Sequence, residues 1–218
     1  MCGRLNIHDH PGIQAFMVSL GLPVYPERPP RYNITPTSNV DVLYTEQRSA
    51  KIESMQWGIE FGEFRHPNTK TETLLRKPHL RKLLADNRCL VPVNRFYEWP
   101  DPKIRPKYQG IKTRFCIHPP EDVMFLGGFY KISGTGSVQF NILTTEPSPA
   151  IAEFHHRMPV IVPPNQVTTW LTTEHEHLLH AMLVPFLEPL IIYECHAYVN
   201  NGRHDGPQCM EPLNSMVN

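Results

Sequence analysis

Proline is the residue type that most restricts the folds open to this chain. The sequence contains 23 prolines among 218 residues, about twice the usual share. Proline has no backbone N–H and a fixed φ angle, so it interrupts helices and central strands. We therefore expect short helices, turns and strand edges in place of long helices.

Local patterns predict many short elements. Strand-like alternation runs through RPPRYNITPTSNVDVLYTEQ, AKIESMQWGIEF up to Gly58, CLVPVNRFYEW, TRFCIH, DVMFLGGFYKI, VQFNILTTE, MPVIVP and LIIYECHAYV. Helices are predicted at 11–21, closed by Gly21, in LLRKPHLRKLLADN, where Pro78 begins the main helix, and as a pair in PPNQVTTWLTTEHEHLLHAML. There is no internal repeat or low-complexity linker. We expect residues 1–218 to form one α+β domain, with a curved, mostly antiparallel, barrel-like β-sheet flanked by short helices.

Composition is that of an ordinary globular protein, with 40% hydrophobic and 19% charged residues. No apolar run approaches the ~18 residues that span a bilayer, and the N-terminus lacks a signal-peptide pattern. We therefore expect a cytoplasmic protein, associated with the nucleoid when it binds DNA, that has no membrane partner.

Cysteine and histidine spacing gives no metal signature. The five cysteines are an odd number without a CxxC pair, which argues against a disulfide framework and against structural zinc. In EHEHLLH, the spacing of a zinc protease is broken because position 179 is leucine. We interpret this segment as a helix surface and expect neither metal nor cofactor.

The chain carries 21 basic and 21 acidic residues, so no global field indicates a nucleic-acid partner. The stretch from Lys70 to Arg88, however, contains six basic residues and only two acidic ones. This stretch fits phosphate binding and a solvated helix face equally well.

The opening MCGR raises a chemical possibility. Once Met1 is removed, Cys2 carries a thiol and an α-amine on adjacent carbons, with reference pKa values near ~8.5 and ~8. Both groups are then partly nucleophilic at neutral pH. The alternative is that Cys2 is a small buried apolar residue.

Three other segments carry amide, carboxyl and imidazole groups that could assist a nucleophile at Cys2. In NTKTET, an extended strand would point Asn68, Lys70 and Glu72 to the same side. In FYEW, two aromatic neighbours would desolvate Glu98 and raise its pKa. HHRMP places two imidazoles beside an arginine. Each segment also has a purely structural explanation, with Asn68 as a turn residue, Glu98 as a charge at a strand edge and His155 as a loop histidine. Together, Cys2, Asn68, Glu98 and His155 make a set typical of a covalent site.

Taken together, these motifs make the chain resemble the SRAP family of SOS response-associated peptidases and abasic-site processing proteins. The resemblance rests on MCGR, RYNITP, MQWG, NTKTET, RCLVPVNRFYEW, ILTTE, HHRMPVIV and VNNGRHDGP, in this order from the first residue to near the last. It implies capture of abasic sites in single-stranded DNA during the DNA damage response. The Cys2 amine would condense with the open-chain sugar aldehyde, and its thiol would close a thiazolidine that shields the lesion.

The resemblance also implies roles for the other residues. Asn68 would orient the Cys2 amine through its amide oxygen, Glu98 would shuttle protons, and His155 would help to open the sugar ring. Further DNA contacts would come from Arg4, Lys70 and Arg157 to phosphates, from Thr144 near the sugar, and from Pro36 and Trp57 to bases.

Several positions depart from the family pattern. Lys70 stands where arginine is usual, which loses a two-pronged phosphate contact. Asn94 and Arg95 replace a common Asp-Gly turn, His156 occupies an often acidic position, and the loop after Trp57 is shortened. None of these departures touches Cys2, Asn68, Glu98 or His155.

Two rival functions use the same residues. One is a thiol peptidase acting on itself, with Cys2 as nucleophile and His155 as base, whose smallest reaction would be removal of Met1. The other is a non-catalytic reader of single-stranded or modified DNA, in which Cys2 only packs. A lyase that nicks the strand after Schiff-base formation is a variant of the main interpretation. We expect a monomer.

Overall fold

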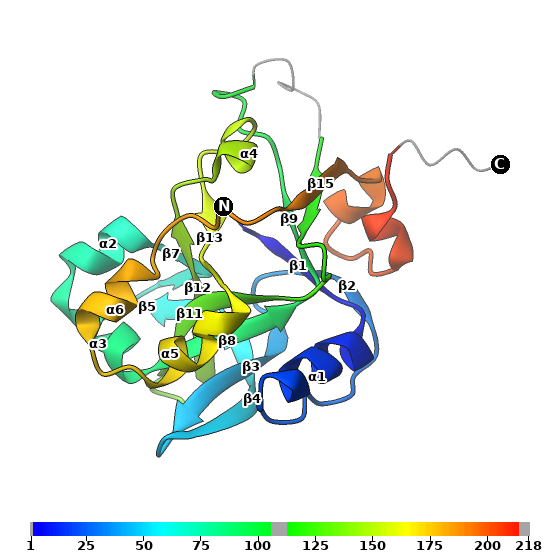
Figure 1. Cartoon of the computed structure of the whole chain (residues 1–218). Helices are drawn as coiled ribbons and strands as arrows, with labels where there is room; N and C mark the ends of the chain where they lie inside the picture. The colour runs from blue at the N-terminus through cyan, green and yellow to red at the C-terminus, as the bar shows by residue number, and fades with distance from the viewer. Residues whose placement is uncertain (1, 106–112, 214–218) are drawn as a thin grey trace.

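Five strands close into a barrel at the centre of the molecule (Figure 1). A computed structural model describes residues 2–105 and 113–213. The barrel strands are β3 (Asn39–Glu46), β4 (Ser49–Trp57), β8 (Arg88–Val93), β11 (Met124–Ile132) and β12 (Val138–Thr145). They pair in the order β12-β4-β3-β8-β11, and β11 pairs again with β12 to complete the ring. Only the β12–β4 pairing in this ring is parallel. The expectation of a mostly antiparallel, barrel-like sheet is confirmed.

Short strands extend the barrel at one end. β7 (Asn68–Lys70) runs parallel to β12, whereas β13 (Met158–Pro159) and β14 (Ile161–Val162) lie antiparallel on β12 and β11. Thr144 of β12 is therefore flanked by Lys70 on one side and by Pro159 on the other. The hairpin of β5 (Ile59–Phe61) and β6 (Phe64–His66) fills the interval between β4 and β7.

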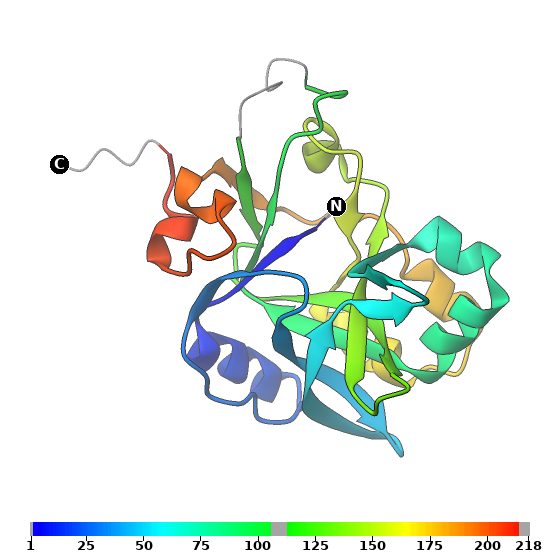
Figure 2. The ribbon, with the colours of Figure 1, turned by 180° about the vertical axis from the view of Figure 1, so that it is seen from behind.

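A second, wholly antiparallel sheet lies beside the barrel. Its order is β15-β10-β9-β1-β2. The strands are β1 (Arg4–Ile7), β2 (Arg31–Ile34), β9 (Arg95–Glu98), β10 (Phe115–His118) and β15 (Ile191–Glu194). Figures 1 and 2 both show the start of β1 near β13, which brings the N-terminal strand to the end of the barrel where β7 also lies.

The predicted run over 89–99 is divided between the two sheets. The break falls at Asn94, which is fully buried. Its side-chain oxygen accepts hydrogen bonds from the backbone of His8 and Asp9, and its nitrogen donates to the carbonyl of Asp122. These bonds hold three separate segments at the break, so β8 stays in the barrel and β9 enters the second sheet.

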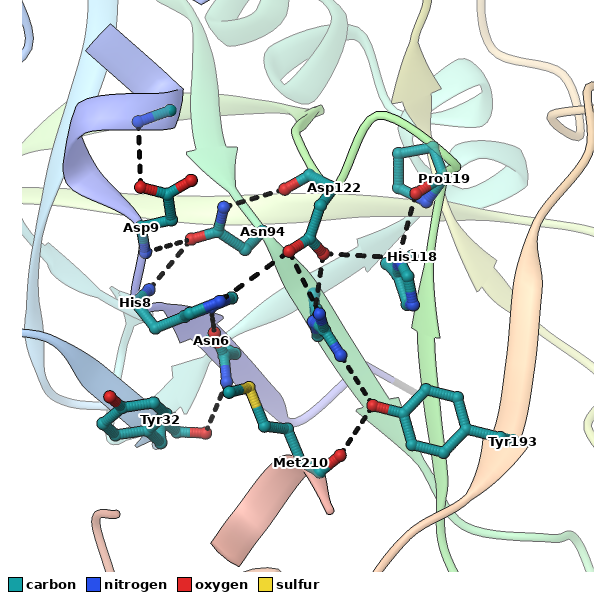
Figure 3. Close-up of polar contacts among 12 residues, drawn as sticks. Asn6, His8, Asp9, Tyr32, Asn94, His118, Pro119, Asp122, Tyr193 and Met210 are labelled. Carbon is teal, nitrogen blue, oxygen red and sulfur yellow. Dashed lines mark hydrogen bonds and ion pairs between the residues drawn. The ribbon is translucent and has the colours of Figure 1, made fainter. Parts of the chain in front are cut away.

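A half-buried polar network connects the two sheets at this break (Figure 3). The carboxylate of Asp122 lies 3.0 Å from Arg95 Nε, 3.3 Å from His118 Nδ1 and 3.7 Å from His8 Nε2. Arg95 also donates to the hydroxyl of Tyr193 on β15. The Asn94-Arg95 pair, a departure noted in the sequence, thus belongs to the framework of the fold.

The described helices are short, as the proline content predicted. The longest has 10 residues. They are α1 (His10–Ser19), α2 (Thr71–Arg76), α3 (Pro78–Asp86), α4 (Pro149–Ala152), α5 (Val167–Thr172) and α6 (Glu176–Ala181), with 3-10 turns η2 (Pro164–Gln166), η3 (Ala197–Asn200) and η4 (Pro207–Met210). Pro78 begins α3, and Gly21 follows α1 with a φ of 69° that favours glycine.

Within residues 2–105 and 113–213, no helix has the length and apolar character needed to cross a bilayer. That residues 1–218 form one domain stays a prediction.

Candidate functional site

Cys2 and Asn68 meet at the end of the barrel. Cys2 directly precedes β1 and is fully buried. Asn68 begins β7, and its side-chain nitrogen donates a 2.8 Å hydrogen bond to the backbone carbonyl of Cys2. The amide oxygen of Asn68 is also buried, and it accepts no hydrogen bond from the described residues. An acceptor therefore lies beside Cys2 without a donor.

Glu98 and His155 form a buried acid–imidazole pair. Glu98 ends β9 with 3% of its surface exposed, and His155 follows α4 with 5% exposed. Glu98 Oε1 lies 3.5 Å from His155 Nε2. Burial raises the pKa of Glu98 to about 7 and lowers the pKa of His155 to about 4. At neutral pH the imidazole is uncharged, while the carboxyl exchanges readily between its acid and base forms.

The backbone of Arg157 supports either neutral form of the His155 ring. His155 Nδ1 lies 2.9 Å from the carbonyl oxygen of Arg157 and 3.1 Å from its amide nitrogen. With a proton on Nδ1 the ring donates to the carbonyl, and without one it accepts from the N–H. His155 can therefore exchange a proton on its Glu98 side and keep a hydrogen bond on the other.

The Cys2 thiol lies near the same acid. Burial raises the pKa of the thiol, and the negative charge of Glu98 raises it further. The sulfur is therefore held as a thiol at neutral pH, and it would act as a nucleophile only if a nearby base took its proton. Among the described side chains, Glu98 is a charged group that acts on the thiol.

Arg157 lies at the site, but its guanidinium is bonded to other groups of the protein and does not point into solvent. It is buried, and its guanidinium donates to both carboxylate oxygens of Glu72, at 2.5 and 2.9 Å, and to the carbonyl of Thr144. This double contact lowers the pKa of Glu72 to about 2. The structure thus pairs Arg157 with Glu72, where the sequence predicted a phosphate ligand.

Glu72 does not continue the strand of Asn68 and Lys70, so that prediction is wrong. β7 ends at Lys70, and Glu72 lies in the first turn of α2. A carboxylate is favoured at a helix N-terminus, and here it also reaches Arg157 of a distant segment. Local alternation in NTKTET could not show this helix start.

Arg4 and Trp99 line the site on the side of the second sheet. The Arg4 guanidinium lies 5.6 Å from the centre of the Trp99 ring, and both residues are half-buried. The indole nitrogen of Trp99 donates to the side chain of Asn200, in the closing VNNGRHDGP motif. Sequence reasoning missed Trp99, although the FYEW motif contained the signal, since the residue after Glu98 is a large aromatic.

Trp57 is not at the surface of the site. It is fully buried, its indole N–H donates to the carbonyl of Pro67, and its ring stacks on Phe140 at 6.4 Å between centroids. The structure therefore gives it a core position, where the sequence predicted a base contact. Pro36 is half-buried in the turn after β2, while Thr144 is fully buried and its hydroxyl has no hydrogen-bond partner among the described residues.

Lys70 is exposed beside a hollow of about 330 Å³. Its lining includes Asn68 and further basic and aromatic side chains, namely Phe61, His66, Lys77 and His79. This hollow adjoins the Cys2 site through Asn68. It extends along α2 and α3, where the sequence showed an excess of basic residues.

The described histidines, cysteines and carboxylates form no group of three that is arranged to hold a metal. The histidines of EHEHLLH lie at and beside α6, where His180 Nε2 is 3.3 Å from Glu176 Oε1. The segment is a charged helix surface, as the sequence indicated.

Comparison with known proteins identifies the class to which this fold and site belong. Residues 1–202 match the SRAP family, described as SOS response associated peptidase. The chain belongs to this family.

Named relatives agree with this assignment, and a solved structure shares the fold. The chain is 27% identical over 228 residues to the abasic site processing protein YoqW of Bacillus subtilis, covering 97% of this chain and 99% of YoqW. It is 24% identical to the abasic site processing protein HMCES of Gallus gallus, covering 84% of this chain and 66% of HMCES. A phage-related protein of Bordetella bronchiseptica has the same fold, with a TM-score of 0.71 at 22% identity over 91% of this chain and 96% of that one.

Proposed function

We propose that this protein captures abasic sites in single-stranded DNA as a covalent adduct on Cys2. The observation that carries the proposal is the set of buried Cys2, Glu98 and His155 with half-buried Asn68, drawn from four distant parts of the chain. The names of the relatives, which are abasic site processing proteins, support abasic sites as the target.

The chemistry needs a free α-amine at Cys2, and Met1 lies outside the described residues. Once Met1 is removed, the amine attacks the sugar aldehyde to form a carbinolamine, which loses water to give an imine. The thiol then adds across the C=N bond: sulfur bonds to carbon, and the thiol proton ends on nitrogen. The product is a five-membered thiazolidine, formed with loss of one water in total.

Glu98 and His155 are the proton-transfer groups of this scheme. Dehydration of the carbinolamine requires a proton on the departing hydroxyl, and thiol addition requires a base for the S–H. A carboxyl with a pKa of about 7 serves both steps near neutral pH. Neutral His155 contacts Glu98 and accommodates either tautomer, so it assists ring opening without adding a buried charge.

Asn68 orients the nucleophile. Its nitrogen already holds the Cys2 carbonyl, and its unpaired buried oxygen is the acceptor that the amine requires. A buried acceptor without a donor costs about 1–3 kcal/mol. Binding of the Cys2 amine would recover that cost and aim the amine lone pair at the aldehyde.

We assign the DNA contacts to the basic and aromatic side chains that line the hollow and the other side of the site. Lys70 and Lys77 beside the hollow next to Asn68 supply positive charge for phosphates, and Phe61 and His66 supply rings for base stacking. Arg4 over Trp99 lines the other side. A strand that crosses the site between these sides would place its sugar at Cys2.

The family description keeps a peptidase as the second candidate. A thiol peptidase is activated by a nearby cation or helix N-terminus that lowers the thiol pKa. Cys2 has the opposite surroundings, since burial and Glu98 raise its pKa. This favours imine chemistry, in which the amine attacks first, and leaves Met1 removal as the smallest peptidase reaction.

The decisive experiment incubates the protein with single-stranded DNA containing one abasic site, followed by a denaturing gel. We expect a heat-stable shifted band with free Cys2 and none with Cys2→Ala or with a variant that retains Met1. Cys209→Ala is the matched control, because Cys209 is also buried but lies in η4. No band from protein shown by mass spectrometry to lack Met1 would refute covalent capture. Adduct formation by Cys2→Ala at the wild-type rate would refute the role of the thiol.

A further inference from the structure

Arg157 is held by other protein groups at both its side chain and its backbone. The guanidinium donates to the two carboxylate oxygens of Glu72, at 2.5 and 2.9 Å, and to the carbonyl of Thr144. The backbone carbonyl oxygen and amide nitrogen of Arg157 lie 2.9 and 3.1 Å from Nδ1 of His155. Only 6% of the Arg157 side chain is exposed. Arg157 therefore links Glu72 to the buried imidazole, and it offers little surface to an external phosphate.

The orientation of the His155 ring depends on this link. The backbone N–H of His155 donates to the carbonyl of Ile151 in α4, which fixes the main chain but not the side-chain torsions. The ring is aimed by the groups that meet it, namely the Arg157 backbone at Nδ1, Glu98 at 3.5 Å from Nε2, and the stacked ring of His156. A shift of the Arg157 backbone would therefore turn Nε2 away from the Glu98 carboxyl.

One short segment of chain connects this link to the nucleophile. Asn68 begins β7 and donates to the backbone carbonyl of Cys2. Glu72 lies four residues further on, in the first turn of α2, which follows β7 directly. The segment 68–72 thus contacts the nucleophile at one end and, through Arg157, supports the acid–base pair at the other.

We propose that Glu72 is a positioning residue of the site. By holding the Arg157 guanidinium it fixes the Arg157 backbone, and that backbone holds the His155 imidazole against Glu98. A guanidinium that binds both oxygens of a carboxylate is fixed in direction as well as in place. The acid–base pair can then transfer protons without first reorienting the ring. This role rests on the proposed function, because the pair moves protons during adduct formation.

A different role for the same pair predicts different kinetics. If Glu72 only occupied a phosphate site on Arg157, DNA would have to displace the carboxylate. Glu72→Gln would then lower the DNA concentration that gives half the maximal rate. If Glu72 positions the imidazole, that concentration stays the same and the maximal rate falls.

The first test measures single-turnover rates of adduct formation against the concentration of single-stranded DNA with one abasic site. We expect Glu72→Gln to lower the maximal rate about tenfold at an unchanged half-saturating concentration. Arg157→Lys keeps the charge but loses the double contact, so it should have the same effect, and the two effects should not multiply in the double variant. Glu153→Gln is the matched control, because Glu153 makes a similar contact with Arg105 two residues before His155.

The second test needs no DNA. In 15N-histidine-labelled protein at constant pH, the NMR signals of His155 are identified by their loss in His155→Gln. We expect the Nδ1 signal of this ring to shift in Glu72→Gln and to stay in place in Glu153→Gln, because Nδ1 meets the Arg157 backbone. Glu72→Asp, which keeps the charge and shortens the side chain, replaces Glu72→Gln in both tests if that variant does not fold.

The two tests separate this proposal from the proposed function. If wild-type protein forms no adduct, the proposed function fails, and the NMR comparison decides whether Glu72 positions the ring. If wild type forms adducts but the folded Glu72 variant keeps its maximal rate within twofold, or changes only the half-saturating concentration, the positioning role is overturned. An unmoved His155 Nδ1 signal in the folded Glu72 variant overturns it as well.

Discussion

Glu98 illustrates how surroundings change the chemistry of a single residue. An exposed glutamate is ionised at neutral pH, but this one is 3% exposed and has a pKa of about 7. The sequence indicated this from the two flanking aromatics. The structure adds His155 as the group that contacts the carboxyl. Glu98 can therefore act as an acid and a base within one reaction.

Replacing Glu98 by glutamine tests this role directly. The glutamine side chain would keep the size and polarity but could not transfer a proton, so we expect the rate of adduct formation to fall about 10²–10⁴-fold. Gel-based single-turnover rates at pH 7 would measure the effect. A Glu98→Gln rate within twofold of wild type would show that another group moves the proton.

The same variant should also change the pH dependence of stability. In wild type the unfolded Glu98 ionises near pH 4.5, while the folded one stays protonated up to about 7. This residue therefore stabilises the fold in acid, and its contribution is lost as the pH rises to about 7. We expect the free energy of unfolding of Glu98→Gln, relative to wild type, to increase between pH 5 and pH 8 in urea titrations.

At the scale of elements, the closing VNNGRHDGP segment is tied to β2. Asp205 Oδ1 accepts hydrogen bonds from the backbone N–H groups of Tyr32 and Asn33. The Asn33 side chain in turn donates to the carbonyls of Val199, Asn201 and His204. These contacts join segments more than 160 residues apart, and they hold Asn200 against Trp99.

Removing this tie should loosen one side of the site. Asp205→Ala would leave two strand N–H groups without their carboxylate acceptor, so we expect a loss of about 1–3 kcal/mol in the free energy of unfolding. Urea unfolding followed by tryptophan fluorescence would measure it, because Trp99 contacts the same segment. Asp86→Ala is a suitable control, since the ion pair of Asp86 with Lys82 is exposed. Equal losses in the two variants would contradict the proposed tie.

At the scale of the whole molecule, burial of histidines makes the fold sensitive to acid. His8 and His118 lie in the network that joins the two sheets (Figure 3), and burial lowers the pKa of both. A depressed histidine pKa means that the unfolded chain binds protons first. The stabilising contribution is complete above the unfolded pKa of about 6.5 and is lost as the pH falls below it.

A single substitution should expose this acid sensitivity. We expect the urea midpoint of wild type to fall between pH 7 and pH 5, and His118→Gln to reduce that fall because one titrating group is gone. The comparison of the two slopes cancels contributions shared by both proteins, Glu98 included. If both proteins lose the same stability, His118 does not contribute to the acid response.

The elements were predictable where local patterns decide them. Proline spacing predicted helices of a few turns, the start of α3 at Pro78 was confirmed, and alternation located most strands. The split of the 89–99 run was not predictable, because the break depends on bonds from Asn94 to His8, Asp9 and Asp122. Local alternation contains no information about such distant partners.

The sequence by itself determined which residues are the candidates for the chemistry, because Cys2, Asn68, Glu98 and His155 each lie in a motif that can be recognised from neighbouring residues. Their catalytic roles stay predictions. Only the tertiary structure decided what surrounds them: barrel closure buries Trp57, a helix start turns Glu72 toward Arg157, and the second sheet brings Trp99 beside Arg4. The physical reason is that burial and pairing depend on contacts between distant segments, which form only when the strands close and the segment around Asn200 packs against Trp99.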